Sequence, residues 1–287
     1  MYFLLLVSVL WALSFGLVGQ VSGLGAPLVT AIRTVLAALV FLPFLRLRGM
    51  RPREVLALGG IGALQFGCMY LLYIQSYRWL QPAEVALFTV FTPLYVALAG
   101  GALAHRIYWR FLATAALAVA GTALCLWTSL GRGGLVLGFL CMQASNVCFA
   151  LGQVLYRRVA PGTGRPDHQL MGILYGGGAL VAVLFAVPGF QWATLAGLTP
   201  VQGATLLYLG VIASGLGFFL FNAGARRTDL GTLAIFNNVK VPLGVLASVL
   251  VFQGRMDWPR VLAGGTVIAL ALALNAWAAG RTRTALP

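Results

Sequence analysis

Residues 82–93, PAEVALFTVFTP, return further along the chain as residues 231–242, GTLAIFNNVKVP, at an offset of 149 residues. Few positions are identical, so the comparison rests on the shared order of apolar, polar and proline positions. Self-similarity at a fixed offset is typical of a chain made of two structural repeats. The sequence therefore predicts a first repeat over residues 1–130 and a second repeat over residues 131–287.

The composition is that of a membrane protein. Of the 287 residues, 61% are hydrophobic and 8% are charged, against about 25% charged residues in an average soluble domain. A helix needs about 20 consecutive apolar residues to cross a bilayer, and the chain contains ten such runs. We place these spans at residues 2–20, 27–45, 55–77, 83–104, 110–128, 135–156, 169–188, 203–223, 231–252 and 259–280.

The expected fold class is all-α integral membrane, with ten transmembrane helices arranged as two inverted five-helix repeats. Lipid offers no hydrogen-bond partner to the backbone, and the apolar runs lack the alternation of a transmembrane barrel. An odd number of helices in each repeat makes the second repeat enter the membrane in the opposite sense. Inverted repeats suit a carrier, because they give it two similar conformations around one central site. We therefore expect a secondary carrier that works by alternating access.

The net charge of +14 indicates membrane topology rather than nucleic-acid binding, because nearly all basic residues fall in loops. With the N-terminus inside, thirteen of the 19 Lys and Arg residues lie on the inner side and four on the outer side. Both termini are therefore expected to be cytoplasmic. The first span begins at Tyr2 without a basic leader, so we expect it to be retained rather than removed as a signal peptide. The inner residues are Arg46, Arg48, Arg51, Arg53, Arg106, Arg110, Arg157, Arg158, Arg165, Arg226, Arg227, Arg281 and Arg283, and the outer ones are Arg78, Arg132, Arg255 and Arg260.

The charged residues argue against an enzyme. All five acidic residues, Glu54, Glu84, Asp167, Asp229 and Asp257, fall in loops or at helix ends, so no carboxylate cluster is placed to hold a metal in the membrane. The single lysine of the chain follows a valine, which excludes a phosphate-binding loop and direct use of ATP. We expect no catalytic residues, no cofactor and no metal. An integral-membrane lipid-modifying enzyme is the less favoured alternative.

Two prolines occupy matching places near the middle of the fourth and ninth spans, Pro93 and Pro242. Each removes a backbone N–H and so leaves a carbonyl one turn earlier, at Thr89 and Asn238, without its helical partner. Paired interrupted helices are a sequence indicator of a transport site. The alternative is a plain structural kink.

Lys240 is expected to lie at the centre of the substrate site. It falls about midway through the ninth span, roughly 15 Å from either end. A charge at that depth costs at least about 2.5–3.5 kcal/mol on insertion scales. We expect Lys240 and Asn237, one turn earlier, to hold the carboxylate of a solute. The alternative is a lysine left uncharged by burial, or one bonded only to carbonyls and water.

Aromatic and polar side chains near the middle of other spans complete the expected site. An aromatic pocket with a few polar groups suits a small amphipathic solute. Gln143, Asn146 and Gln153 also form a polar stripe along one face of the sixth span. The expected lining residues are Trp11, Ser14, Tyr73, Phe91 and Tyr95, with Asn146 or Ser214 meeting an amino group.

Arg33 lies in the second turn of the second span. One interpretation pairs it with Glu84 at the start of the fourth span as an outer gate. The other is an anchor that reaches outwards to lipid headgroups.

The chain resembles the ten-helix EamA-type branch of the drug/metabolite transporter superfamily. The matching features are the five-plus-five layout, the segment TAIRTVLAALVFLPFL in the second span, and the spacing of Ala83, Ala86 and Pro93. The acidic residue that many members carry after the fourth helix of a repeat is absent, because the stretch reads ALAHRIYW here. The resemblance implies a bacterial inner-membrane carrier that exports hydrophobic, aromatic or other neutral amino acids, or similar metabolites. The alternative within transport is an exporter of drugs or other organic solutes.

Overall fold

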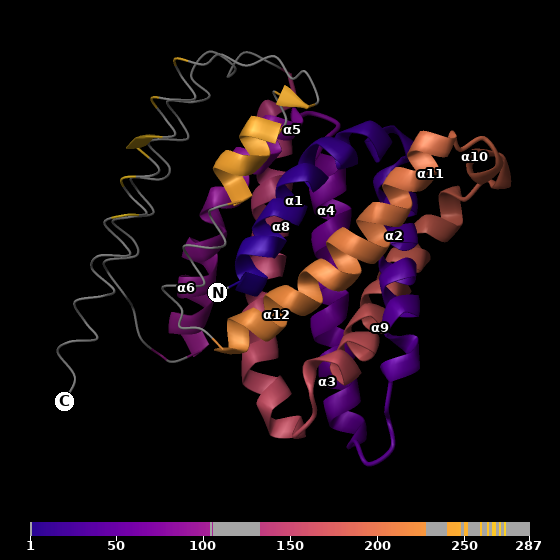
Figure 1. The fold of residues 1–287 in the computed structure, drawn as a ribbon, viewed down its shortest axis with the longest axis vertical. Helices are drawn as coiled ribbons and strands as arrows, with labels where there is room; N and C mark the ends of the chain where they lie inside the picture. Colours follow the sequence, from indigo (N-terminus) through magenta and orange to yellow (C-terminus); the bar gives the residue numbers. More distant parts are fainter. Residues whose placement is uncertain are drawn as a thin grey trace.

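The computed structural model describes residues 2–103, 105, 133–227, 240–247, 250 and 251, together with residues 259, 263, 266, 267, 270 and 273. Within these ranges every regular element is helical, and Figure 1 shows the helices side by side in one bundle. Seven helical stretches are long and apolar enough to cross a membrane. They begin and end near seven of the ten predicted spans and confirm the all-helical class. The fifth, ninth and tenth spans and the inversion of the second repeat stay predictions, since most residues of these three spans lie outside the described ranges.

The seven stretches contain the following elements. The bounds are α1 (Tyr2–Val21) and η1 (Ser22–Leu24); α2 (Ala26–Phe41) and η2 (Leu42–Phe44); α3 (Pro52–Gly62), η3 (Ala63–Cys68) and α4 (Met69–Ser76); α5 (Pro82–Phe88), η4 (Thr89–Phe91) and α6 (Thr92–Leu103); α8 (Leu135–Val159) and η5 (Ala160–Thr163); α9 (Asp167–Ala186) and η6 (Val187–Gly189); α11 (Pro200–Leu207), η7 (Tyr208–Leu216) and α12 (Gly217–Arg227). A short helix, α10 (Trp192–Ala196), connects η6 to α11.

Two of the acidic residues fix the starts of helices. The backbone N–H of Arg51 donates to Glu54 Oε2 at 3.0 Å, and that of Gln81 donates to Glu84 Oε2 at 2.8 Å. In both helices a proline occupies the first turn, where its missing N–H is not needed. These carboxylates therefore satisfy backbone donors at helix ends, as expected from their positions in the sequence.

Glycines bring α3 and α9 into backbone contact. A Cβ added at Gly62 would lie 1.8 Å from the carbonyl oxygen of Leu174, and one added at Gly177 would lie 2.0 Å from that of Gly59. Small residues at helix crossings allow this approach inside membranes. Gly176 by contrast faces open space, with no atom within 4 Å of an added Cβ. The surface of α9 that touches α3 therefore includes Gly177 and not Gly176.

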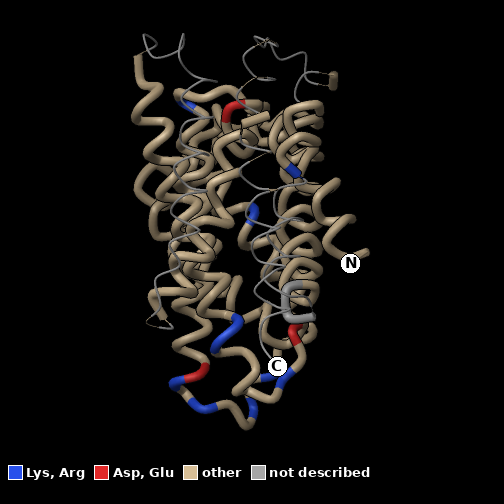
Figure 2. Tube along the Cα trace, turned by 90° about the vertical axis from the view of Figure 1, so that its left-hand side faces the viewer, with Lys and Arg blue, Asp and Glu red and all other residues tan. Residues whose placement is uncertain are grey.

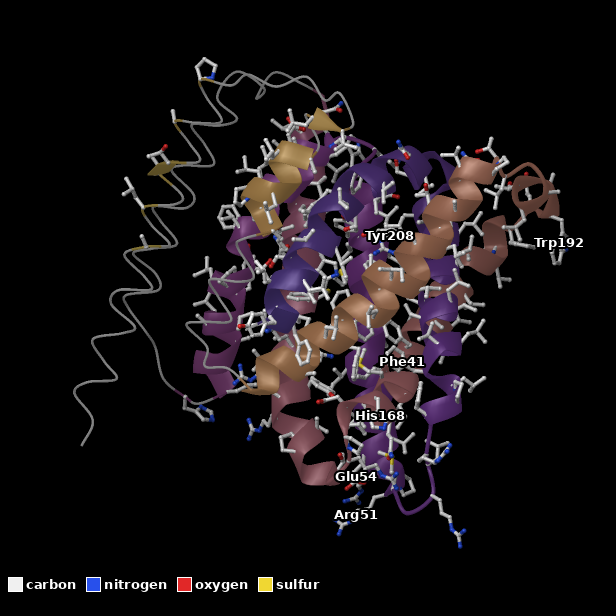
Figure 3. All side chains as sticks on the ribbon, viewed as in Figure 1. Phe41, Arg51, Glu54, His168, Trp192 and Tyr208 are labelled. Atoms are coloured by element: carbon white, nitrogen blue, oxygen red, sulfur yellow. The ribbon has the colours of Figure 1, made fainter. Side chains whose placement is uncertain are left out.

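Basic residues gather at one end of the bundle, as Figure 2 shows. This basic end is formed by the turn between α2 and α3 and the turn between α8 and α9. Arg165 reaches across it and donates to the backbone carbonyl of Arg48. Figure 3 labels Arg51 and Glu54 at the same end, while Trp192 of α10 lies at the opposite end. The asymmetry agrees with the expected charge bias, and the cytoplasmic placement of this end stays a prediction.

Candidate substrate site

Two π-helical segments, η3 and η7, lie within candidate membrane-spanning stretches, and backbone carbonyls of η7 accept hydrogen bonds from side chains in the bundle interior. In η7 the carbonyl of Ala213 accepts from Trp11 Nε1 at 2.8 Å, and that of Ser214 accepts from Tyr175 Oη at 2.7 Å. A π-helical turn departs from the usual bonding pattern and often marks a functional position. Tyr208 of the same segment, labelled in Figure 3, donates to the carbonyl of Leu10 at 3.1 Å and so links η7 to α1. The segment therefore fixes the position of Trp11.

Lys240 lies beside Trp11, one of the residues expected to line the site. Its side chain is 7% exposed, and its Nζ lies 5.0 Å from the Trp11 ring centroid and 5.5 Å from that of Phe149. Trp11 also packs against Phe218 and Phe221, with centroid distances of 4.7 and 5.0 Å. A cation over an aromatic face gains about 0.5–2 kcal/mol. The result is a buried ammonium with an aromatic wall from α1, α8 and α12.

The helical segment 240–247 packs against the first half of the chain. Val241 belongs to an apolar cluster with Leu87, Val90 and Phe91. A Cβ added at Gly244 would lie 2.6 Å from the Phe15 ring. The residues that follow Lys240 are therefore held against α1 and the α5–η4 region.

The fourth span changes from α-helix to a 3-10 segment, η4, directly before Pro93. The carbonyl of Thr89, expected to be free, accepts from the backbone N–H of Thr92. The carbonyl of Phe88 instead receives a side-chain donor, Asn146 Nδ2, at 2.8 Å. The prediction placed the free carbonyl at Thr89, one residue after its actual position at Phe88. In the 3-10 turn the N–H of Thr92 bonds to the carbonyl three residues earlier, at Thr89, rather than to the one four residues earlier.

Asn146 is the centre of a polar cluster between α6 and α8. Its Nδ2 also donates to Gln143 Oε1 at 3.1 Å, and its Oδ1 accepts from Thr92 Oγ1 at 3.2 Å. Tyr95 Oη donates to the same Gln143 oxygen at 3.2 Å. Of these side chains, only Gln143 has a buried polar atom, Nε2, without a hydrogen-bond partner in the described part of the chain. The cluster is thus almost fully satisfied within the protein.

Arg33 lies in the bundle interior. Its side chain is 3% exposed, its guanidinium carbon lies 4.0 Å from the Tyr70 ring centroid, and its Nε donates to Ser214 Oγ at 3.2 Å. Tyr70 Oη shares a 2.8 Å hydrogen bond with the same Ser214 hydroxyl. Neither sequence interpretation of Arg33 included these contacts with α4 and η7, and both the gate and the headgroup anchor stay predictions. Glu84, its proposed gate partner, caps the start of α5.

Two further residues of the expected site, Ser14 and Tyr73, make hydrogen bonds close to the groups described above. Ser14 Oγ donates to the carbonyl of Trp11 at 2.7 Å, while Tyr73 Oη bonds to Tyr77 Oη at 2.8 Å. Asn237 and Asn238 lie outside the described residues. Phe149 was missed, although it shares the α8 face of Asn146 and Gln153 at helical spacing.

The described residues offer no group of three His, Cys, Asp or Glu side chains that could hold a metal. A groove of about 340 Å³ lies between α2, α9 and α10, away from the predicted site residues. Its lining is entirely apolar, with Ile32, Val183 and Phe190 among its residues. This groove therefore lacks the polar groups that would orient a polar solute.

Comparison with known proteins identifies the family. The model of the EamA-like transporter family matches residues 1–127 and 136–276. The chain belongs to this family. It is 36% identical to the biotin transporter of Salmonella typhimurium (strain LT2), over 98% of this chain and 95% of the relative. It is 39% identical to the probable biotin transporter of Pseudomonas aeruginosa, over 96% and 97%. The biotin transporter of Escherichia coli (strain K12) is 36% identical, over 98% and 95%.

A solved crystal structure has the same fold, with a TM-score of 0.69 and 21% identity over 97% of each chain. Membership of the EamA-like family confirms the resemblance drawn from the sequence. The protein is an integral membrane transporter of a small molecule, and the expectation that it is not an enzyme is confirmed. The relatives are named as biotin transporters, so they do not support amino-acid export specifically.

Proposed function

We propose that this protein is a secondary carrier that moves biotin across the bacterial inner membrane. The relatives named as biotin transporters match nearly the whole chain, which supports a shared substrate class. Biotin combines a carboxylate, an aliphatic chain, a sulfur-containing ring and a ureido ring. A site for it needs a buried positive charge, apolar walls and hydrogen-bonding groups.

The observation that carries this proposal is the position of Lys240 against Trp11 and Phe149. A buried ammonium provides a counter-charge for the carboxylate of biotin. Hydrogen bonds between two charged groups are stronger than those between neutral groups. The aromatic wall formed with Phe218 and Phe221 suits the aliphatic chain and the sulfur ring. Lys240 thus keeps the carboxylate role expected from the sequence, while the solute changes from an amino acid to biotin.

Amino acids fit the described groups less well. The expected contacts for an amino group, Asn146 and Ser214, already bond to other groups of the protein. A cationic drug would place its charge close to Lys240, and like charges in a poorly solvated site repel. Both solute classes are competing outcomes of the transport test.

The test is counterflow in proteoliposomes that contain the purified carrier. With unlabelled biotin inside, radiolabelled biotin should accumulate transiently without ATP or an ion gradient, because a carrier exchanges solute through alternating access. Unlabelled amino acids added outside should not compete. Exchange of an amino acid with no exchange of biotin would contradict the proposal.

A second measurement is the melting temperature of the purified protein with added ligand. A ligand at 100 times its Kd stabilises the native state by about 2.7 kcal/mol. Biotin should therefore raise the melting temperature, whereas biotin methyl ester, which lacks the carboxylate charge, should do so much less. Equal shifts with both compounds would argue against a carboxylate site.

We expect Pro93→Ala to slow transport without loss of folded protein. Alanine restores an N–H that can bond to the carbonyl of Thr89, which favours a continuous helix in place of η4. The hydrogen bond from Asn146 to Phe88 would then be lost or displaced. If straightening the helix hinders the conformational change by about 1 kcal/mol, exchange slows about fivefold. Biotin counterflow measures the rate, and Pro43→Ala, in η2 at the end of α2, is the control. An unchanged rate in Pro93→Ala would leave the helix break with a structural role only.

A further inference from the structure

Two glutamines in the bundle interior have polar atoms that the described part of the chain does not satisfy. Gln65 is 0% exposed and Gln153 is 1% exposed. The amide nitrogen and oxygen of both side chains are buried without a hydrogen-bond partner among the described residues. Buried polar groups are nearly always hydrogen-bonded, so each exception calls for a reason. Four such atoms on two side chains make these glutamines candidates for contact with a solute.

The two glutamines belong to elements that touch each other. Gln65 lies in the π-helical segment η3, and Gln153 lies in α8. A Cβ added at Gly152 would lie 2.4 Å from Gln65 Cβ, so the α8 backbone passes directly against the base of the Gln65 side chain. Gln153 is the next residue on α8. A π-helical turn often marks a functional position, and η3 supplies Gln65 at this crossing.

Residues close to the two glutamines along their helices contact the aromatic wall of the Lys240 site. Phe149 precedes Gln153 by one helical turn, about 6 Å along the axis, and its ring lies 5.5 Å from Lys240 Nζ. Phe66, which follows Gln65, packs against Phe218 at a centroid distance of 4.9 Å. Phe218 in turn contacts Trp11. These ring contacts connect the surroundings of Lys240 with the helical segments that carry the two glutamines.

We propose that Gln65 and Gln153 bind the ureido ring of the solute whose carboxylate is held by Lys240. This inference rests on biotin being the solute. A ureido group has two N–H donors and one carbonyl acceptor, and two primary amides offer complementary oxygens and N–H groups. The cluster around Asn146 is a weaker candidate, because its members bond to one another and leave only Gln143 Nε2 without a partner in the described residues.

The test compares Gln65→Leu and Gln153→Leu with a matched control, Gln75→Leu. Gln75 lies on α4, ten residues beyond Gln65, and is half-buried. The probes are biotin, desthiobiotin, which keeps the ureido ring, and octanoate, which has only the carboxylate and chain. Both site variants should raise the Kd for biotin and desthiobiotin about tenfold or more, because the ureido group loses its partners on binding. Octanoate binding should stay unchanged in both variants, and the control should match wild type throughout.

The melting temperature without ligand separates recognition from a structural role. Replacing an unsatisfied buried amide by an apolar side chain should raise it, since the burial penalty disappears. Should either leucine variant fail to fold, Gln65→Met or Gln153→Met takes its place, because methionine is unbranched and of similar length.

The outcomes distinguish this inference from the proposed function. If wild type binds biotin and both site variants bind it equally well, the ureido role is wrong and biotin transport stands. A lower melting temperature together with unchanged ligand affinity would assign the glutamines to packing. If wild-type protein binds no biotin, the proposed function fails and the inference fails with it.

Discussion

Lys240→Met should abolish high-affinity binding of biotin while the protein still folds. Losing one partner of a buried charged contact costs about 2–5 kcal/mol, so the Kd should rise at least about thirtyfold. Methionine has a similar length and an apolar side chain, and it can occupy the space beside Trp11 and Phe149. Titration of biotin against the purified variant measures the loss, and the melting temperature without ligand checks the fold.

Two controls sharpen this result. Lys240→Arg should keep part of the affinity for biotin, because the positive charge remains although the guanidinium group differs in shape from the ammonium group. Biotin methyl ester should bind wild type and Lys240→Met equally weakly, since it has no charge to lose. If Lys240→Met binds biotin with wild-type affinity, the carboxylate lies elsewhere. Arg33, the other buried cation of the described bundle, would then be the residue to change next.

Gly177→Val should destabilise the bundle, whereas Gly176→Val should not. At Gly177 an added Cβ would lie 2.0 Å from the Gly59 carbonyl oxygen, but at Gly176 no atom lies within 4 Å. A clash with backbone cannot be relieved by turning a side chain, so α3 and α9 must separate. Overpacking typically costs about 1–3 kcal/mol, and we expect a melting temperature lower by about 5 °C or more.

The comparison of neighbouring glycines isolates the backbone contact, because the two substitutions add the same side chain to the same helix. Thermal unfolding of detergent-solubilised protein gives the measurement. We also expect weaker biotin binding in Gly177→Val, since α3 continues into η3 and carries Gln65 and Phe66. Equal melting temperatures for the two variants would show that α3 and α9 adapt without loss of packing.

The sequence by itself determined the class of molecule and the approximate course of its helices. Apolar runs of membrane-spanning length can be recognised without knowing which helices pack together. Lipid requires every helix separately to satisfy its own backbone hydrogen bonds and to present an apolar surface. The break near Pro93 was equally predictable, since proline removes its N–H wherever it occurs. The expectation that Lys240 lies midway through its span comes from its distance to both ends in the sequence and stays a prediction, because most of that span lies outside the described residues. Membership of a transporter family was likewise recognisable, although the expected amino-acid substrate gained no support.

Tertiary structure decided which groups meet. Periodicity identified the α8 face of Asn146 and Gln153, but it could not show that Phe149 on that face lies beside Lys240. It also could not tell that Arg33 points to Ser214 rather than to Glu84, because that choice depends on a helix 181 residues away in sequence. The prediction for Thr89 failed by one residue for a related reason. A 3-10 or π-helical turn changes which carbonyl is free, and such turns are selected by the packing of neighbouring helices rather than by local sequence alone.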